Sequence, residues 1–237
     1  MSDKPILFSA PMVRALLAGT KTQTLREITV PTKGQYVRPD MGGWAGTTIG
    51  GAGARLADGT PVPEQAAIWN QTTGTTIAMR YAVGDRLWVR EHWRTYSTLD
   101  DHPPRDITGV RVWYEADEGY KPKSRFRQGM HMPRWASRIT LTVTDVRVQR
   151  LQEISEEDAK AEGITEHPTL GPHRGPDATF WAAGDGKTDH NARLTPASAY
   201  KALWEEINGE GSWDRNPWVA AYTFTVELAN IDQVRAA

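Results

Sequence analysis

The chain has 237 residues, a length that suits one enlarged domain or two small ones. Its formal net charge is −1, so no overall basic field marks it for nucleic-acid binding, and any such contact would have to be local. It contains no cysteine, which excludes disulfides, thiol catalysis and zinc sites built on sulfur. No run approaches about 18 apolar residues, and residues 1–8 lack the apolar core of a signal peptide. We therefore expect a soluble cytoplasmic protein with no membrane partner.

The chain opens with a predicted strand followed by a helix. The apolar run at residues 6–8 predicts a short strand. Residues 10–18 then form an apolar helical stretch, with Ser9 as a possible N-cap and Pro11 near the first helical position. Gly19 should end the helix, because glycine reaches the left-handed conformation at little cost.

A polar stretch rich in chemically useful side chains follows this helix. Residues 19–26 read Gly-Thr-Lys-Thr-Gln-Thr-Leu-Arg. Lys21 supplies an ammonium that can lose its proton when it is desolvated, and a threonine supplies a hydroxyl nucleophile. Arg26 supplies a fixed cationic fork that suits an anion or the edge of a nucleobase. From composition alone, the alternative is a polar loop whose lysine and arginine are solvated.

Residues 31–79 form a region rich in glycine and proline, in which we find no periodicity. We expect a long irregular insertion here. A stretch of this length without regular structure is usually functional or mobile, so we interpret it as a flap over one end of a barrel.

Four later segments carry the alternation of half-buried strands. They are residues 81–93, 110–114, 139–148 and 218–228. Glu91 lies at the end of the apolar face of the first of them, where it is either a solvated strand-end residue or a carboxylate that points into a pocket. The basic loop at residues 121–127 could meet phosphates or simply be solvated.

Two more helices are predicted in the second half of the chain. Ser155 begins one, with Asp158 completing a capping box, and Gly163 ends it. A second irregular insertion follows at residues 165–195. Residues 196–207 then form an amphipathic helix.

The order of elements predicts an α+β fold, with mostly antiparallel strands around a central barrel and few flanking helices. We expect a single domain over residues 1–230, with the insertions at 31–79 and 165–195. Residues 231–237 would form a C-terminal tail.

Two short motifs resemble the ASCH family, whose members are small barrels related to the PUA fold. The first is the pattern Gly-x-Lys-Thr-x-Thr-x-Arg at residues 19–26, placed between a helix and a strand. The second is Glu162-Gly163-Ile164 at the end of the helix after the central strands. The resemblance implies a PUA-like, mostly antiparallel β-barrel, and it does not extend to the two insertions.

Small ASCH members that are amidohydrolases remove the acyl group from N4-acetylcytidine, using a lysine, a threonine and a helix glutamate. The resemblance places these roles on Lys21, Thr24 and Glu162. Thr24 would be the nucleophile, Lys21 its base after burial and the charge of Arg26 lower its pKa, and Glu162 the acid for the leaving amine. In an alternative assignment Glu162 activates water and Thr24 positions the substrate. In an extended chain residues 21 and 24 point to opposite faces, so their convergence requires a turn at residues 22–23.

The partner implied by this reaction is a small modified nucleoside. Arg26 and Glu91 are candidates for binding the cytosine edge, and Trp135 for stacking on the ring. The histidines lack the spacing of metal ligands, so we expect no metal and no cofactor. Other ASCH members bind or cleave RNA, so an RNA-binding or RNA-cleaving module that uses Lys21, Arg26 and the basic loop is the alternative function.

Overall fold

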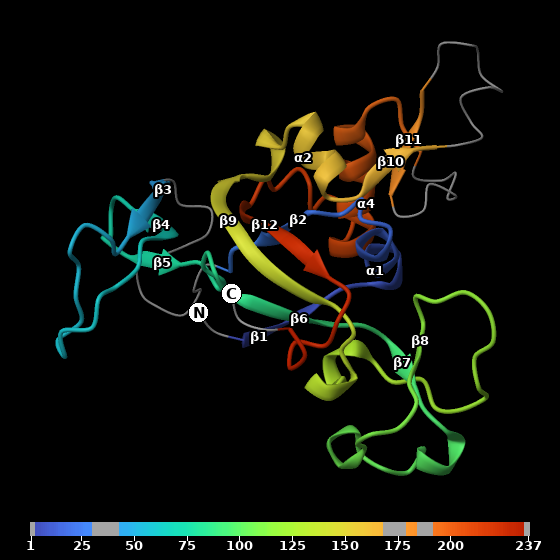
Figure 1. Cartoon of the computed structure of the whole chain (residues 1–237). Coiled ribbons are helices and arrows are strands. Elements are labelled where there is room, and N and C mark those ends of the chain that lie inside the picture. The colour runs from blue at the N-terminus through green and yellow to red at the C-terminus, as the bar shows by residue number, and fades with distance from the viewer. Residues whose placement is uncertain (1–2, 30–42, 168–178, 184–191, 235–237) are drawn as a thin grey trace.

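The computed structural model describes residues 3–29, 43–167, 179–183 and 192–234. Within these residues the fold is α+β, with many strands in mostly antiparallel sheets and few helices, as predicted (Figure 1). The strands are β1 Asp3–Leu7, β2 Gln23–Glu27, β3 Trp44–Ile49, β4 Gln65–Asn70, β5 Thr76–Ala78, β6 Arg86–Arg90, β7 Trp93–Arg94, β8 Trp113–Tyr114, β9 Thr140–Arg150, β10 Ile164–Glu166, β11 Trp181–Ala183 and β12 Trp218–Glu227. The α-helices are α1 Ala10–Leu17, α2 Glu156–Ala161 and α4 Pro196–Asn208. Short 3-10 turns lie at Ser97–Leu99, Pro104–Asp106, Gly129–His131, Arg134–Ala136 and Leu151–Glu153.

A five-stranded sheet in the order β1-β6-β9-β12-β2 organises the described part of the chain. Only β1 and β6 run parallel, and the other neighbours are antiparallel. The long strands β9 and β12 lie side by side across the centre, and β9 curves strongly (Figure 1). The edge strands β1 and β2 do not pair with each other among the described residues, so no closed barrel is detected there. The PUA-like barrel therefore stays a prediction.

The two faces of β12 contribute to different hydrophobic cores, as its predicted alternation requires. Tyr222 and Phe224 face the main core, together with residues of β1, β6 and α1. Val219 and Ala221 face a second core, which α2 and α4 cover. The strand β2 runs along the edge of this two-faced sheet, so it borders both cores.

Two helix termini that the sequence predicted, the end of α1 at Gly19 and the start of α2 at Ser155, are present. Gly19 has a φ of +72°, and its amide donates to the Leu16 carbonyl while the Thr20 amide reaches the Ala15 carbonyl. These two bonds form a Schellman motif, which satisfies the last carbonyls of α1. The predicted cap of α2 is also confirmed, because Ser155 and Asp158 form a reciprocal capping box.

The irregular structure that we expected over residues 31–79 is wrong from residue 44 onward. The strands β3, β4 and β5 form a three-stranded antiparallel sheet there, and residues 31–42 lie outside the described part. One of the glycines that suggested a loop has a packing reason, since a Cβ at Gly46 would lie 2.9 Å from the Val148 side chain of β9. In Figure 1 this small sheet stands at one end of β9.

Other predicted boundaries differ in smaller ways. The strand expected at residues 110–114 is reduced to β8. The second insertion contains β10 and β11, which pair through Ile164 and Ala183, while residues 168–178 and 184–191 lie outside the described part. Ile231, at the start of the predicted tail, is fully buried. No helix in the described ranges has the length and apolar character needed to cross a membrane.

Candidate functional site

The polar stretch after α1 runs directly against the C-terminal end of α2. Lys21 forms an isolated antiparallel bridge with Glu162, and the Thr22 amide donates to the Ala161 carbonyl at 2.8 Å. The backbone is extended through this region, and β2 begins at Gln23. The turn at residues 22–23 that we required is therefore absent, and the candidate residues meet around Glu162 instead.

Lys21 and Glu162 form a completely buried ion pair. Their side chains are 0% and 1% exposed. The Lys21 ammonium donates to the Glu162 carboxylate at Oε2 and to the Glu162 backbone carbonyl at 2.9 Å. The Leu25 amide of β2 donates to the other carboxylate oxygen, Oε1. Both oxygens of the carboxylate are thus held in place, one by the lysine and one by the edge strand.

The environment of Lys21 favours its neutral amine. Burial lowers the pKa of Lys21 below its ordinary value of 10.5, because the charged form loses its hydration. The Glu162 carboxylate opposes this shift, and the charge of Arg26 adds to it. This is the direction that a lysine acting as a base requires.

Gly163 allows the two segments to approach this closely. Its φ is +95°, a conformation that L side chains rarely adopt. A Cβ there would lie 3.0 Å from the Cβ of Ala15 and 3.4 Å from the Cβ of Lys21. The Glu-Gly pair that contributes to the family resemblance thus has a direct packing role, because α1, α2 and Lys21 all meet at this glycine.

Thr24 lines a small pocket beside the ion pair. It is 1% exposed and lies opposite Tyr222 in the sheet. The pocket has a volume of about 70 Å³ and lies between β2 and α4, with Glu162 among its lining residues. No hydrogen bond joins Lys21 or Glu162 to the Thr24 hydroxyl. The ammonium donates to Glu162, and the carboxylate accepts from Lys21 and from the Leu25 amide.

The structure adds Tyr200 to this site, which the sequence analysis did not identify. Tyr200 lies on α4, is 3% exposed and lines the same pocket. Burial raises the pKa of its hydroxyl well above the ordinary value, and the Glu162 charge adds to this shift while Arg26 opposes it. The phenol therefore stays protonated beside the carboxylate. The available signal was the helical spacing of Tyr200 with Leu203 and Trp204, which places all three on one face of α4.

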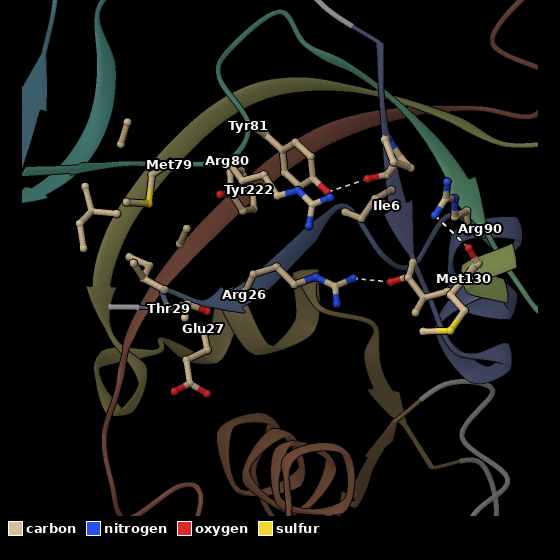
Figure 2. Close-up of a pocket in the computed structure, with 16 residues that line it drawn as sticks. Ile6, Arg26, Glu27, Thr29, Met79, Arg80, Tyr81, Arg90, Met130 and Tyr222 are labelled. Atoms are coloured by element: carbon tan, nitrogen blue, oxygen red, sulfur yellow. Dashed lines mark hydrogen bonds between the residues drawn. The ribbon is translucent and has the colours of Figure 1, made fainter. Parts of the chain in front are cut away.

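Arg26 borders the pocket and reaches away from the ion pair into a second cavity. Its guanidinium lies 5.0 Å from the centre of the Phe8 ring, and Nη2 donates to the Leu7 carbonyl at 2.6 Å. The second cavity has a volume of about 530 Å³, and Arg26 and Glu27 line both spaces. Figure 2 shows Arg26 extending into this larger cavity. The two cavities therefore adjoin along β2.

The structure does not bring the other two substrate-binding candidates to this site. Glu91 is 1% exposed and forms a bidentate ion pair with Arg138, at 2.9 and 3.0 Å. The Trp135 indole donates to the Ile107 carbonyl at 2.8 Å and packs in a separate small core. Neither residue lines the pocket of Thr24 or the larger cavity.

The basic loop at residues 121–127 is largely engaged within the chain. The Arg127 guanidinium donates to the carbonyls of Leu99 and His102, and Lys121 pairs with Glu115 at 3.6 Å.

Across the described ranges, no three His, Asp or Glu side chains gather closely enough to hold a metal ion. Comparison of the chain with models of known families, with curated proteins and with solved structures found no match.

Proposed function

We propose that this chain is a metal-independent amidohydrolase that removes the acyl group from N4-acylated cytosine nucleosides, on a PUA-like fold of the ASCH family. One observation carries the proposal: the buried Lys21–Glu162 pair adjoins the pocket that Thr24 lines. A base, an acid and a hydroxyl are the groups that amide hydrolysis requires. Retention of all three residue types at matching positions supports the ASCH resemblance.

The buried pair carries one proton that can reside on either partner. Transfer from the Lys21 ammonium to Glu162 gives a neutral amine and a neutral carboxylic acid, which are the base and the acid that the reaction needs. Burial favours this transfer, because it penalises the two separated charges. A single proton shift within the pair therefore prepares the site.

In the first half-reaction the Thr24 oxygen attacks the acyl carbon and its proton passes to the Lys21 amine. The bond between the acyl carbon and N4 then breaks, and Glu162 gives its proton to the departing nitrogen. The products are cytidine and an ester of Thr24. The pair is left as an ammonium and a carboxylate, which is the ionic form described above.

In the second half-reaction the Glu162 carboxylate takes a proton from water, which attacks the ester. The ester bond to Thr24 breaks, and the Lys21 ammonium returns a proton to the threonine oxygen. The acyl group leaves as the free acid, and the pair regains its neutral form. The alternative, in which Glu162 activates water to attack the amide directly, uses the same residues with Thr24 only as a positioning group.

The walls of the small pocket suit the acyl group. Met12, Leu203 and Ile207 contribute apolar surface to the pocket that Thr24 lines. A volume of about 70 Å³ is well below the ~300–1,000 Å³ of typical small-molecule sites, so it can take only part of a substrate. We assign the acyl end to this pocket and the rest of the molecule to the adjoining cavity.

The direct test is the ultraviolet spectrum of N4-acetylcytidine incubated with the purified protein in the presence of a metal chelator. Conversion to cytidine is expected, with a loss of about a hundredfold or more in Lys21→Ala and Thr24→Ala. The matched control is Thr22→Ala. Thr22 is exposed and lies between Lys21 and Thr24 in the sequence, so its substitution should leave the rate unchanged. A parent protein that leaves the substrate intact over a wide pH range would refute the proposal.

A further inference from the structure

Three arginines line the larger cavity. Arg26 comes from β2, Arg80 follows β5, and Arg90 ends β6. Figure 2 shows all three around Tyr81, whose hydroxyl donates to the Pro5 carbonyl at 2.8 Å. Arg26 is far in the sequence from Arg80 and Arg90, so the fold brings positive charge from separate segments into this one cavity.

None of these arginines forms a salt bridge with a carboxylate in the described part of the chain, although the buried charge of Glu162 acts on Arg26. The Arg26 side chain donates to the Leu7 carbonyl, and the Arg90 side chain donates to the Met130 carbonyl at 3.1 Å. The Nε atoms of Arg26 and Arg90 are buried and have no hydrogen-bond partner among the described residues. Among the described residues that line the cavity, Glu27 is the one carboxylate, and Figure 2 shows it pointing away from Arg26.

The charges of the three arginines act on one another and on the tyrosine between them. Burial lowers the pKa of Arg26 and of Arg90. The Glu162 carboxylate opposes this shift at Arg26, and the charge of Arg80 adds to the shift at both arginines. Burial raises the pKa of the Tyr81 hydroxyl, and Arg80, Arg26 and Arg90 each oppose that shift. Like charges gathered in this way repel, so the cavity is a site prepared for an anion.

The geometry points to the phosphate of a nucleotide: we infer that the arginine cavity binds a phosphate monoester on the sugar of the substrate, so that the preferred substrate is an acylated cytosine nucleotide. Arginine forks match phosphate oxygens, and several cations suit a dianion. The cavity volume of about 530 Å³ lies in the range of small-molecule sites. Arg26 joins this cavity to the pocket of Thr24, so the acyl group and the phosphate would lie at opposite ends of one ligand.

This inference rests on the proposed function for the identity of the base, but the phosphate site can be tested by binding alone. Titration calorimetry would compare cytidine 5′-monophosphate with cytidine. The parent should bind the monophosphate at least about tenfold more tightly than cytidine. A single hydrogen bond to a charged group contributes enough binding free energy to account for about a tenfold change in affinity. Inorganic phosphate should compete with the monophosphate and leave cytidine binding unchanged.

The variants Arg80→Gln and Arg90→Gln should each lose most of the preference for the monophosphate and keep the affinity for cytidine. Arg80 is exposed, so its replacement should not affect folding. Arg90→Lys keeps the positive charge and tests whether phosphate binding requires the planar guanidinium group. Arg105→Gln is the matched control, because Arg105 is exposed and lies outside both cavities. It should bind both compounds as the parent does.

Equal affinity for the two compounds would overturn the inference. So would a single-stranded oligocytidine that binds tightly while the monophosphate gains nothing over cytidine, since that result would indicate an RNA-binding surface. Rates on N4-acetylcytidine and its 5′-monophosphate separate the two proposals. Tighter binding of the monophosphate without hydrolysis of either compound would refute the amidohydrolase and leave the phosphate site standing. Hydrolysis of both compounds with equal affinity for the monophosphate and cytidine would refute the phosphate site and leave the amidohydrolase standing.

Discussion

Lys21 and Glu162 are separated by 141 positions in the sequence, yet the lysine donates to both the carboxylate and the backbone carbonyl of the glutamate. A buried ion pair of this kind contributes little stability compared with well-packed apolar residues, because both charges lose their hydration. Its position beside Thr24 instead suits acid–base chemistry. The relationship between these two residues is the basis of the proposed reaction.

The pair should show strong coupling in stability measurements. Lys21→Met or Glu162→Leu alone leaves a buried charge without its partner and should cost about 3–5 kcal/mol in the free energy of unfolding. The double variant removes both charges and should be distinctly more stable than the sum of the two losses implies. Urea denaturation of the four proteins measures the coupling. Additive losses would mean that the two side chains do not interact.

Gly163 should tolerate alanine poorly because of contact as well as backbone conformation. Gly163→Ala combines the strain of a positive φ with a Cβ placed 3.0 Å from Ala15, and we expect a loss of about 2–4 kcal/mol. Gly119→Ala is the control, since Gly119 has a φ of +97° and open space around it. It should lose only the conformational part, about 1–2 kcal/mol. Equal losses in thermal unfolding would argue against the close packing at Gly163.

The pH dependence of deacylation should be bell-shaped, because the reactive pair carries one proton. Activity falls at high pH when that proton is lost, and the pKa of Lys21, which burial and Arg26 lower, sets this limb below 10.5. Arg26→Gln removes a neighbouring positive charge, so the ammonium becomes easier to maintain and the alkaline limb should move to higher pH. Arg26→Lys keeps the charge and should leave the limb where it is. A shift to lower pH in Arg26→Gln would contradict the role of Lys21.

Glu91 should affect stability rather than substrate binding. Glu91→Gln leaves Arg138 without its buried carboxylate partner and should cost about 2–3 kcal/mol in the free energy of unfolding. The KM for N4-acetylcytidine should not change, since Glu91 lines neither cavity. Asp117→Asn is a useful comparison, because Asp117 pairs with the same arginine but is exposed, and its loss should cost under about 1 kcal/mol. A raised KM in Glu91→Gln would restore the binding role that the sequence suggested.

The local features of this fold were predictable from sequence because they depend on neighbouring residues. The Schellman motif at Gly19, the capping box at Ser155 and the alternation of β12 all follow from spacing. The ASCH resemblance selected Lys21 and Glu162, which the fold does bring together.

Features that depend on distant pairing could not be predicted. The partner of Glu91 is Arg138, 47 positions away, so its buried ion pair left no local signal. The sheet of β3, β4 and β5 was not predicted because Gly46 suggested a loop. The structure shows that the close approach of β9 requires a glycine at this position. The gathering of Arg26, Arg80 and Arg90 likewise follows from sheet order and not from spacing.

The most direct test of the reaction centre is rapid-quench mass spectrometry of the protein mixed with N4-acetylcytidine. The proposed mechanism predicts one acetyl group on the peptide that contains Thr24, formed together with an equal amount of cytidine in the first turnover. Thr24→Ala should form neither, and Thr22→Ala should behave as the parent. Release of cytidine without an acetylated peptide would assign the attack to water activated by Glu162. A parent protein that releases no cytidine would contradict the proposed function itself.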